Sequence, residues 1–245
     1  MFQLSVVGRT DVGLLRANNE DAFVTMPERG VAAVADGMGG SASGEVASAV
    51  FAEAVREVFS DRPGPGEGEP AALVAETFRR ANERILRMAG ENPEHRGMGC
   101  TAELLVFHGG QYVAGHVGDS RCYLFREGAL AQITVDHSLV QDQVAKGLLT
   151  PEEANSHSFK NVILRAVGVE DALAVDLIRG DCRSGDLFLL CSDGLSDMVD
   201  DGRIAETLAR SLPLAQKANR LVELAKMAGG RDNITVVLCE VGKPQ

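Results

Sequence analysis

The 245-residue chain is 45% hydrophobic, which is enough to bury a large core, and we expect one domain spanning residues 1–245. The net charge of -11, the aromatic content of 4% and the absence of Trp argue against nucleic acid as a partner. No basic leader precedes an apolar stretch and no apolar run approaches the ~20 residues that span a bilayer, so we expect a cytoplasmic protein that does not bind membranes. We also expect a monomer.

The first half of the chain shows three strand-like runs and then two helices. The runs occupy residues 2–8, 21–27 and 31–36, and a Gly/Pro-rich loop over 61–70 separates the helices. The first helix is predicted over 43–59 with Ser43 as its N-cap, and the second begins at Pro70. Their apolar stripes consist of Val46, Val50, Ala54, Val55 and Phe59, and of Val74, Phe78, Ala81 and Ile85.

The second half returns to strands. Runs at 101–108 and 111–118 flank a Gly109-Gly110 turn typical of a hairpin, and a third run covers 120–127. Short helices in a polar, mobile connection are expected over 138–156, and a last helix from about Pro213 to Gly229. Later strands are predicted at 172–178, 186–193 and 233–241. This order lacks strict strand–helix alternation, so it indicates an α+β fold: an antiparallel β-sandwich with helices packed outside.

The five cysteines contain no CxxC pair. They are Cys100, Cys122, Cys182, Cys191 and Cys239, and several lie within apolar runs. We therefore expect small buried side chains in a reducing compartment.

A carboxylate stands at the end of several apolar runs. Asp36, Asp119 and Asp193 each follow such a run, and Asp232 precedes one. Each residue alone could be a turn residue or a helix N-cap. Side by side, however, their charges would raise one another's pKa values or require cations.

The available ligand atoms are all oxygens. No Cys or His stands at metal-binding spacing near these aspartates, which favours Mg²⁺ or Mn²⁺ over Zn²⁺. Gly37 supports this hypothesis, because a residue without Cβ lets its carbonyl approach an ion. Arg16, just before Glu20 and Asp21, suggests an anionic substrate such as a phosphoryl group, although a surface salt bridge would explain it equally well.

Five short motifs together resemble a known family. They are "RANNEDA" (16–22), "ADGMGG" (35–40), "GDSR" (118–121), "CSDGLSD" (191–197) and "GGRDNITVV" (229–237). In order and spacing they resemble the metal-dependent, PPM-type serine/threonine phosphatases, the bacterial branch of the protein phosphatase 2C-like family. The resemblance runs from about residue 4 to 241 and implies a four-layer α/β/β/α fold.

The resemblance also implies roles for individual residues. Asp36 would bridge two Mn²⁺ or Mg²⁺ ions, with the Gly37 carbonyl on one and Asp193 and Asp232 on the other. Asp119, with Asp193, would hold a third, weaker ion, and Asp197 could assist. Glu20 and Asp21 would orient metal-bound waters, and Arg16 would hold the substrate phosphate. Residues 137–161 would form a mobile flap that shapes substrate access.

The implied reaction is hydrolysis of phosphoserine and phosphothreonine in proteins by in-line attack of a metal-bridged hydroxide. The implied partners are phosphoproteins and a cognate bacterial serine/threonine kinase. Met38 departs from the pattern of several eukaryotic members, where a His is proposed as general acid. His137 is one alternative proton donor, but an ordinary surface or capping role is the favoured interpretation of this residue.

Two other functions were considered. "GMGGSA" (37–42) matches a dinucleotide-binding fingerprint, but Asp36 directly before it would repel a pyrophosphate, and Glu57, about 20 residues on, falls in a helix. A catalytically silent module that binds metal or phosphoprotein is the second alternative. Loss of metal ligands would indicate such a module, and none is missing from the motifs.

Overall fold

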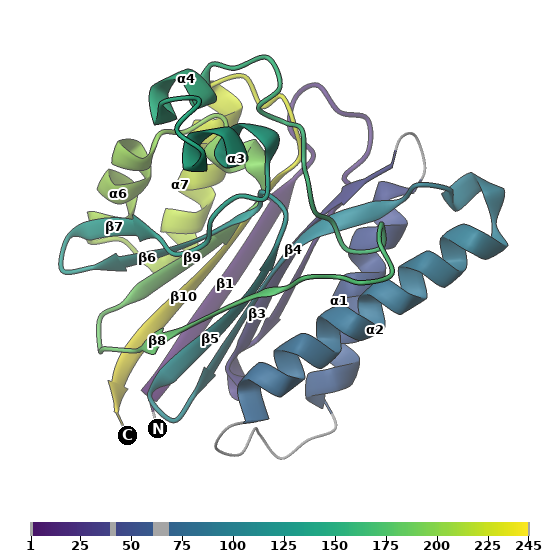
Figure 1. The fold of residues 1–245 in the computed structure, drawn as a ribbon. Helices are drawn as coiled ribbons and strands as arrows, with labels where there is room; N and C mark the ends of the chain where they lie inside the picture. Colours follow the sequence, from purple (N-terminus) through teal and green to yellow (C-terminus); the bar gives the residue numbers. More distant parts are fainter. Residues whose placement is uncertain (1, 40–42, 61–68, 245) are drawn as a thin grey trace.

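Two five-stranded antiparallel sheets pack face to face in the computed structural model, which describes residues 2–39, 43–60 and 69–244 (Figure 1). The first sheet has the order β1 (Phe2–Asp11), β10 (Ile234–Pro244), β9 (Leu187–Cys191), β6 (Arg121–Arg126) and β7 (Ala129–Gln132). The second has the order β2 (Asp21–Met26), β3 (Val31–Met38), β4 (Gly99–His108), β5 (Gln111–Val117) and β8 (Asp176–Asp181).

Helices cover the outer face of each sheet, as Figure 1 shows. Helices α1 (Gly44–Ser60) and α2 (Glu69–Glu91) pack on the second sheet. Helices α5 (Asp193–Ser196), α6 (Asp201–Ala209) and α7 (Leu214–Met227) cover the first. Two short helices, α3 (Leu139–Ala145) and α4 (Pro151–Asn155), belong to the long connection between β7 and β8. The layers are therefore helix, sheet, sheet, helix, which confirms the predicted α+β sandwich.

The core has three apolar clusters, one between each pair of layers. Side chains alternate along β4, so that Leu104 packs toward α1 and α2 while Leu105 packs toward the other sheet. Phe51 of α1 and Phe78 of α2 meet edge to face with ring centroids 5.0 Å apart. Each fully buried side chain of this size contributes roughly 1.5–3 kcal/mol to folding.

The predicted helices and hairpin are confirmed. All four residues of the α2 stripe are fully buried, and Gly109 and Gly110 form the β4–β5 turn with positive φ angles of 59° and 82°. Ser43 directly precedes α1, although its hydroxyl donates to the carbonyl of Glu94. Most of the predicted loop, residues 61–68, and Gly40 to Ala42 lie outside the described residues.

Two strands differ from the sequence prediction. The strand expected at 172–178 is β8 at Asp176–Asp181, because Leu173 and Val175 pack on the core without joining the ladder. Strand β7 was missed, since Ala129–Gln132 is a short, mostly exposed run after a turn at Glu127 and Gly128. All five cysteines are free and buried, as expected. Within the described residues, no helix has the length and apolar character needed to cross a bilayer.

Candidate active site

Asp21 and Asp36 face one another across two strands of the second sheet. They are direct partners in the antiparallel register of β2 and β3, and Thr101 of β4 is the partner of Asp36 on its other side. Directly opposed residues in a sheet have Cβ atoms about 4.5–5.5 Å apart. The register alone therefore brings two carboxylates together at one end of this sheet.

The first sheet contributes its acidic residues at the same end of the sandwich. Asp193 opens α5 directly after β9, and Asp232 lies two residues before β10. Ser192 joins the sheets, because its hydroxyl donates to Asp21 Oδ2 at 2.7 Å and accepts from the Thr235 amide at 3.0 Å. The residue types of Ser192 and Thr101 gave no sequence signal, so sequence reasoning missed both.

Asn233 anchors the segment that carries Glu20. Its side-chain oxygen accepts from the Glu20 amide at 2.7 Å, and its side-chain nitrogen donates to the carbonyls of Val12 and Asn18. One amide group thus satisfies three backbone groups of a segment without regular structure. Asn233 belongs to the motif at 229–237, but the sequence did not predict it as a site residue.

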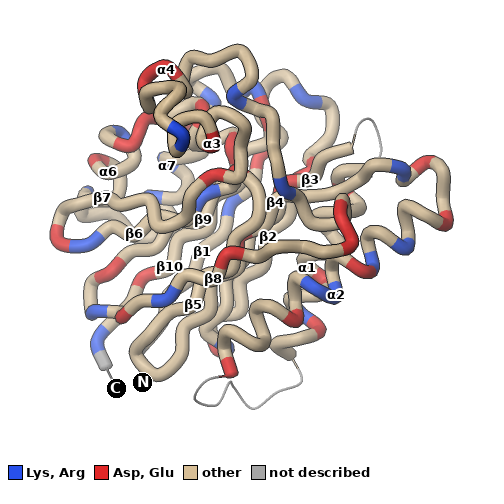
Figure 2. The backbone as a smooth tube through the Cα atoms, in the orientation of Figure 1, with Lys and Arg blue, Asp and Glu red and all other residues tan. Residues whose placement is uncertain are grey.

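A cavity of about 390 Å³ collects most of the predicted site residues. Figure 2 shows acidic positions near this end of the strands, on the side of the molecule that carries α3 and α4. The predicted residues that line the cavity are Arg16, Glu20, Asp36, Gly37, Asp119, Asp193 and Asp232. Asp21 is not part of the lining; it lies behind Asp36 and is held by Ser192.

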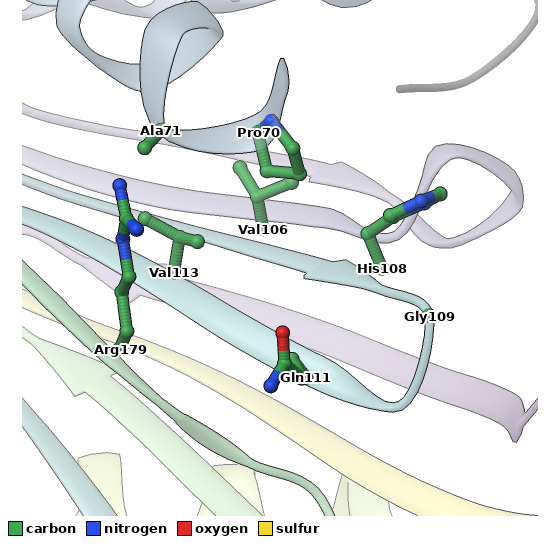
Figure 3. Close-up of a pocket in the computed structure, with 8 residues that line it drawn as sticks. All are labelled: Pro70, Ala71, Val106, His108, Gly109, Gln111, Val113 and Arg179. Carbon is green, nitrogen blue, oxygen red and sulfur yellow. The ribbon is translucent and has the colours of Figure 1, made fainter. Parts of the chain in front are cut away.

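Another hollow, of about 270 Å³, lies at the opposite end of β4 (Figure 3). Pro70, Ala71, Val106 and Val113 form its apolar walls, and the described residues that line it include no carboxylate. It therefore lacks the ligands of a divalent cation site.

Arg16 forms an ion pair with Asp232 at the mouth of the acidic cavity. Its guanidinium donates to Asp232 Oδ2 at 2.6 Å, while Oδ1 of the same carboxylate accepts from the Asn233 amide at 2.8 Å. The Arg16 side chain remains 53% exposed. The remaining guanidinium N–H groups can therefore reach an incoming anion.

The turn that carries Asp119 is fixed against β4. A side chain at Gly118, whose φ is 109°, would collide with Thr101, and the hydroxyls of Thr101 and Ser120 are 2.7 Å apart. Since Thr101 is also the register partner of Asp36, the positions of Asp119 and Asp36 are set relative to the same residue.

Burial and mutual repulsion dominate the electrostatics of the cavity. Burial, followed by the charges of Asp21 and Asp193, raises the pKa of Asp36 well above its usual range. Burial, followed by Asp119 and Asp232, does the same to the pKa of Asp193. The pKa values of Asp21 and Asp119 are each raised to about 6, again chiefly by burial. Bound cations would relieve this repulsion.

The chemistry of the cavity fits hard divalent cations. The buried Oδ1 atoms of Asp21 and Asp193 have no hydrogen-bond partner, and any side chain at Gly37 would collide with the carbonyl of Gly44. Among the described residues, no three Asp, Glu, His or Cys side chains yet surround a single point. Asp232, one of the expected ligands, is instead paired with Arg16.

His137 does not have the contacts expected of a general acid. Its Nδ1 accepts from the Gly118 amide at 3.1 Å, its Nε2 lies 3.2 Å from Asp176, and its side chain is only 8% exposed. It is also not among the residues that line the acidic cavity. Met38 does line the cavity, but its thioether has no proton to donate.

A larger cavity of about 830 Å³ adjoins the site and shares Asp119, Asn161 and Asp193 with it. Residues of the 137–161 segment form one wall, and residues 196–202 form another. Lys160 of that segment forms an ion pair with Asp197 across this cavity. The expected flap thus contacts the body of the protein beside the acidic cluster.

The fold and the cavity together define a sandwich protein with an acidic cavity, whose carboxylate and carbonyl oxygens are the ligand type that hard divalent cations prefer. The sequence pattern described as Protein phosphatase 2C matches residues 16–228. The chain belongs to this family. The dinucleotide-binding alternative is wrong, since β3 pairs antiparallel with both of its neighbours.

Curated relatives agree with this assignment. The chain is 43% identical over 239 residues to the serine/threonine protein phosphatase PstP of Mycobacterium tuberculosis, covering 97% of this chain and 45% of PstP. It therefore spans less than half the length of that relative. It is 37% identical over 237 residues to the protein phosphatase PhpP of Streptococcus pneumoniae, covering 96% of both chains.

Solved structures show the same fold. The Mycobacterium tuberculosis PstP structure superimposes with a TM-score of 0.92 at 41% identity, covering 99% of this chain and 100% of that chain. A structure of the PstP catalytic domain in complex with two manganese ions gives a TM-score of 0.90, also at 41% identity and with the same coverage. These findings support the enzymatic hypothesis and give no support to the catalytically silent alternative.

Proposed function

We propose that this chain is a metal-dependent phosphatase that removes phosphate from phosphoserine and phosphothreonine in proteins. The observation that carries the proposal is the convergence of Asp36, Asp119, Asp193 and Asp232 on one cavity with Arg16 at its mouth. The manganese-containing PstP structure supports Mn²⁺ as the ion, and Mg²⁺ has the same ligand preference.

The residues present define how the ions would be held. Asp36, the Gly37 carbonyl, Asp193 and Asp232 would hold two ions, and Asp119 with Asp193 a weaker third. When bound, such ions lower the pKa of water toward neutrality and offset negative charge on a phosphoryl group.

The chain's own groups would then bind the substrate and orient water. The exposed guanidinium of Arg16 would bind two phosphoryl oxygens, and it stabilises charge that develops on them in the transition state. Glu20 and Asp21 would orient water as hydrogen-bond acceptors. Neither Met38 nor His137 is placed to protonate the leaving alkoxide, so solvent is the proton source we favour.

The cellular setting is also part of the proposal. We expect a monomeric cytoplasmic domain, with residues 137–161 as a mobile flap, that reverses the action of a cognate serine/threonine kinase. The kinase connection rests on the family alone. A phosphoproteome that is unchanged when this protein is deleted would contradict it.

The direct test is hydrolysis of a phosphothreonine peptide by the purified chain. We expect turnover with Mn²⁺, its loss with a chelator, and its recovery when Mn²⁺ is restored in excess. Asp193→Ala should lower kcat/KM by roughly a hundredfold or more. Asp171→Ala, which removes an exposed carboxylate elsewhere, should leave kcat/KM unchanged. Binding of peptide and Mn²⁺ without hydrolysis would instead indicate a regulatory module.

A further inference from the structure

Glu103 and His116 form a buried pair within the sandwich. They are direct partners in the register of β4 and β5, both are fully buried, and Glu103 Oε1 contacts His116 Nδ1. Glu103 lies two residues beyond Thr101 and therefore on the same face of β4. None of the roles assigned above uses this pair.

The contacts of His116 fix where its protons lie. Its Nε2 is 2.9 Å from the carbonyl of Val135, which can only accept, so Nε2 must carry a proton. The contact between His116 Nδ1 and Glu103 Oε1 therefore holds one shared proton. The adjacent carboxylate raises the pKa of His116 against the effect of burial, which alone would lower it.

His116 supports a second histidine at the start of the expected flap. The rings of His116 and His137 pack with centroids 4.5 Å apart. His137 forms two hydrogen bonds with Gly118, in the turn before Asp119. Its Nδ1 accepts from the Gly118 amide, and its own amide donates to the Gly118 carbonyl at 2.7 Å. The His137 carbonyl in turn accepts from the amide of Leu164, where the chain returns from the flap.

The neighbours of His137 are also tied to the strands. The Thr134 hydroxyl accepts from the Cys122 amide, the Val135 carbonyl accepts from His116, and Asp136 forms a two-pronged ion pair with Arg121. Residues 134–137 thus form a root for the flap, and each of them has a partner elsewhere in the sheets. The Glu103–His116 pair contacts this root from the interior of the protein, where both side chains are fully buried.

We propose that Glu103 and His116 are positioning residues that hold His137, and through it the Asp119 turn and the root of the flap, in the geometry needed for cation binding. The inference deepens the proposed function by assigning a support to one candidate ligand. Of the measurements below, only kcat/KM requires that the chain be a phosphatase. Mn²⁺ affinity and amide spectra test the positioning role even if the wild-type chain hydrolyses nothing.

The test uses the double variant Glu103→Leu/His116→Leu. Replacing a buried ion pair with apolar residues is commonly neutral or stabilising, so this variant should fold with a thermal midpoint close to that of the wild type. We expect the Mn²⁺ affinity of the weakest binding step that calorimetry resolves to fall roughly tenfold. We expect kcat/KM to fall by a similar factor. The Gly118 amide resonance of the metal-free protein should also shift.

The control removes a buried hydroxyl that has no link to the site. Thr77→Val deletes the hydrogen bond that Thr77 donates to Leu73 within α2, and should leave Mn²⁺ affinity unchanged. A folded double variant with wild-type Mn²⁺ affinity and kcat/KM would overturn the inference, since the pair would then serve packing alone.

If the double variant does not fold, single variants at Glu103 test the positioning role. In Glu103→Gln, the amide can donate to Nδ1 of neutral His116 and preserve the contact, so Mn²⁺ affinity should stay within about threefold of wild type. Glu103→Leu leaves His116 Nδ1 without a hydrogen-bond partner and should weaken Mn²⁺ binding roughly tenfold. Wild-type affinity in Glu103→Leu, or equal losses in both single variants, would overturn the inference.

Discussion

The Ser192 hydroxyl donates a 2.7 Å hydrogen bond to Asp21, joining residues 171 positions apart that belong to different halves of the sandwich. Ser192 also accepts from the Thr235 amide, so one hydroxyl connects β2, β9 and β10. The two sheets are therefore held together beside the acidic cavity by a polar contact as well as by the apolar core.

Substituting Ser192 should destabilise the fold. We expect Ser192→Ala to lower the free energy of unfolding by about 1–3 kcal/mol, because the buried Thr235 amide and the Asp21 carboxylate both lose a partner. Urea denaturation of the metal-free protein measures this. Ser48→Ala, at a buried serine whose hydroxyl donates within α1, is the matched control. Equal losses would contradict the role of Ser192 as a link between the sheets.

The metal-free protein should become less stable as the pH rises from about 4 to about 6. Burial raises the pKa values of Asp21 and Asp119 from 3.8 to about 6, so the folded state binds more protons than the unfolded state in this window. The resulting stabilisation is complete below pH 3.8 and is lost as the pH passes through 6. Thermal melts in a chelator at a series of pH values measure the trend.

Mn²⁺ should reverse the sign of this pH dependence. Cations bind the deprotonated carboxylates, so the increase in thermal midpoint caused by Mn²⁺ should grow as the pH rises through 6. The same melts with excess Mn²⁺ provide the comparison. A Mn²⁺-induced increase that is constant from pH 5 to 7 would show that these carboxylates do not bind the ion.

Replacing Arg16 with Lys should affect substrate binding more than turnover. Lys cannot reproduce the planar fork that binds two phosphoryl oxygens, so we expect KM for a phosphothreonine peptide to rise roughly tenfold with a smaller change in kcat. Steady-state kinetics measures both constants. Arg9→Lys, at a position that bonds Asn219, is the control. A fall in kcat with KM unchanged would show that Arg16 acts in the transition state alone and does not contribute to substrate binding.

The ion pair between Lys160 and Asp197 should restrain the flap. Lys160→Met removes this link across the 830 Å³ cavity, and we expect faster amide exchange over 139–161 with little change in global stability. Lys146→Met is the control, because Lys146, directly after α3, pairs with Asp142 of that helix, and this ion pair stays within the segment. Equal exchange rates in the two variants would contradict the proposed restraint.

The sequence predicted the acidic cluster because each member stands where an apolar run meets a turn. Hydrophobic patterning predicts where strands end, and a carboxylate at such a position needs a compensating partner. Ser192 and Asn233 were missed as site residues, since their importance lies in partners more than 170 positions away. Glu103 was missed because a single acidic residue in a strand-like run does not reveal that a histidine faces it.

The misplacement of β8 has a similar cause. The apolar residues at 172–175 resemble a strand, but the segment that pairs with β5 is Asp176–Asp181. Patterning shows which residues seek burial, whereas tertiary pairing decides which of them join a sheet.

The neighbouring positions of β1 and β10 have a consequence for biosynthesis. Asp21 and Asp36 are synthesised before Asp232 and the strand that follows it, and this strand, β10, must insert between β1 and β9. A nascent chain that stops before Asp232 therefore lacks one member of its acidic cluster. We therefore expect a chain without Asp232 and β10 to be unable to hold the cations that the proposed reaction requires.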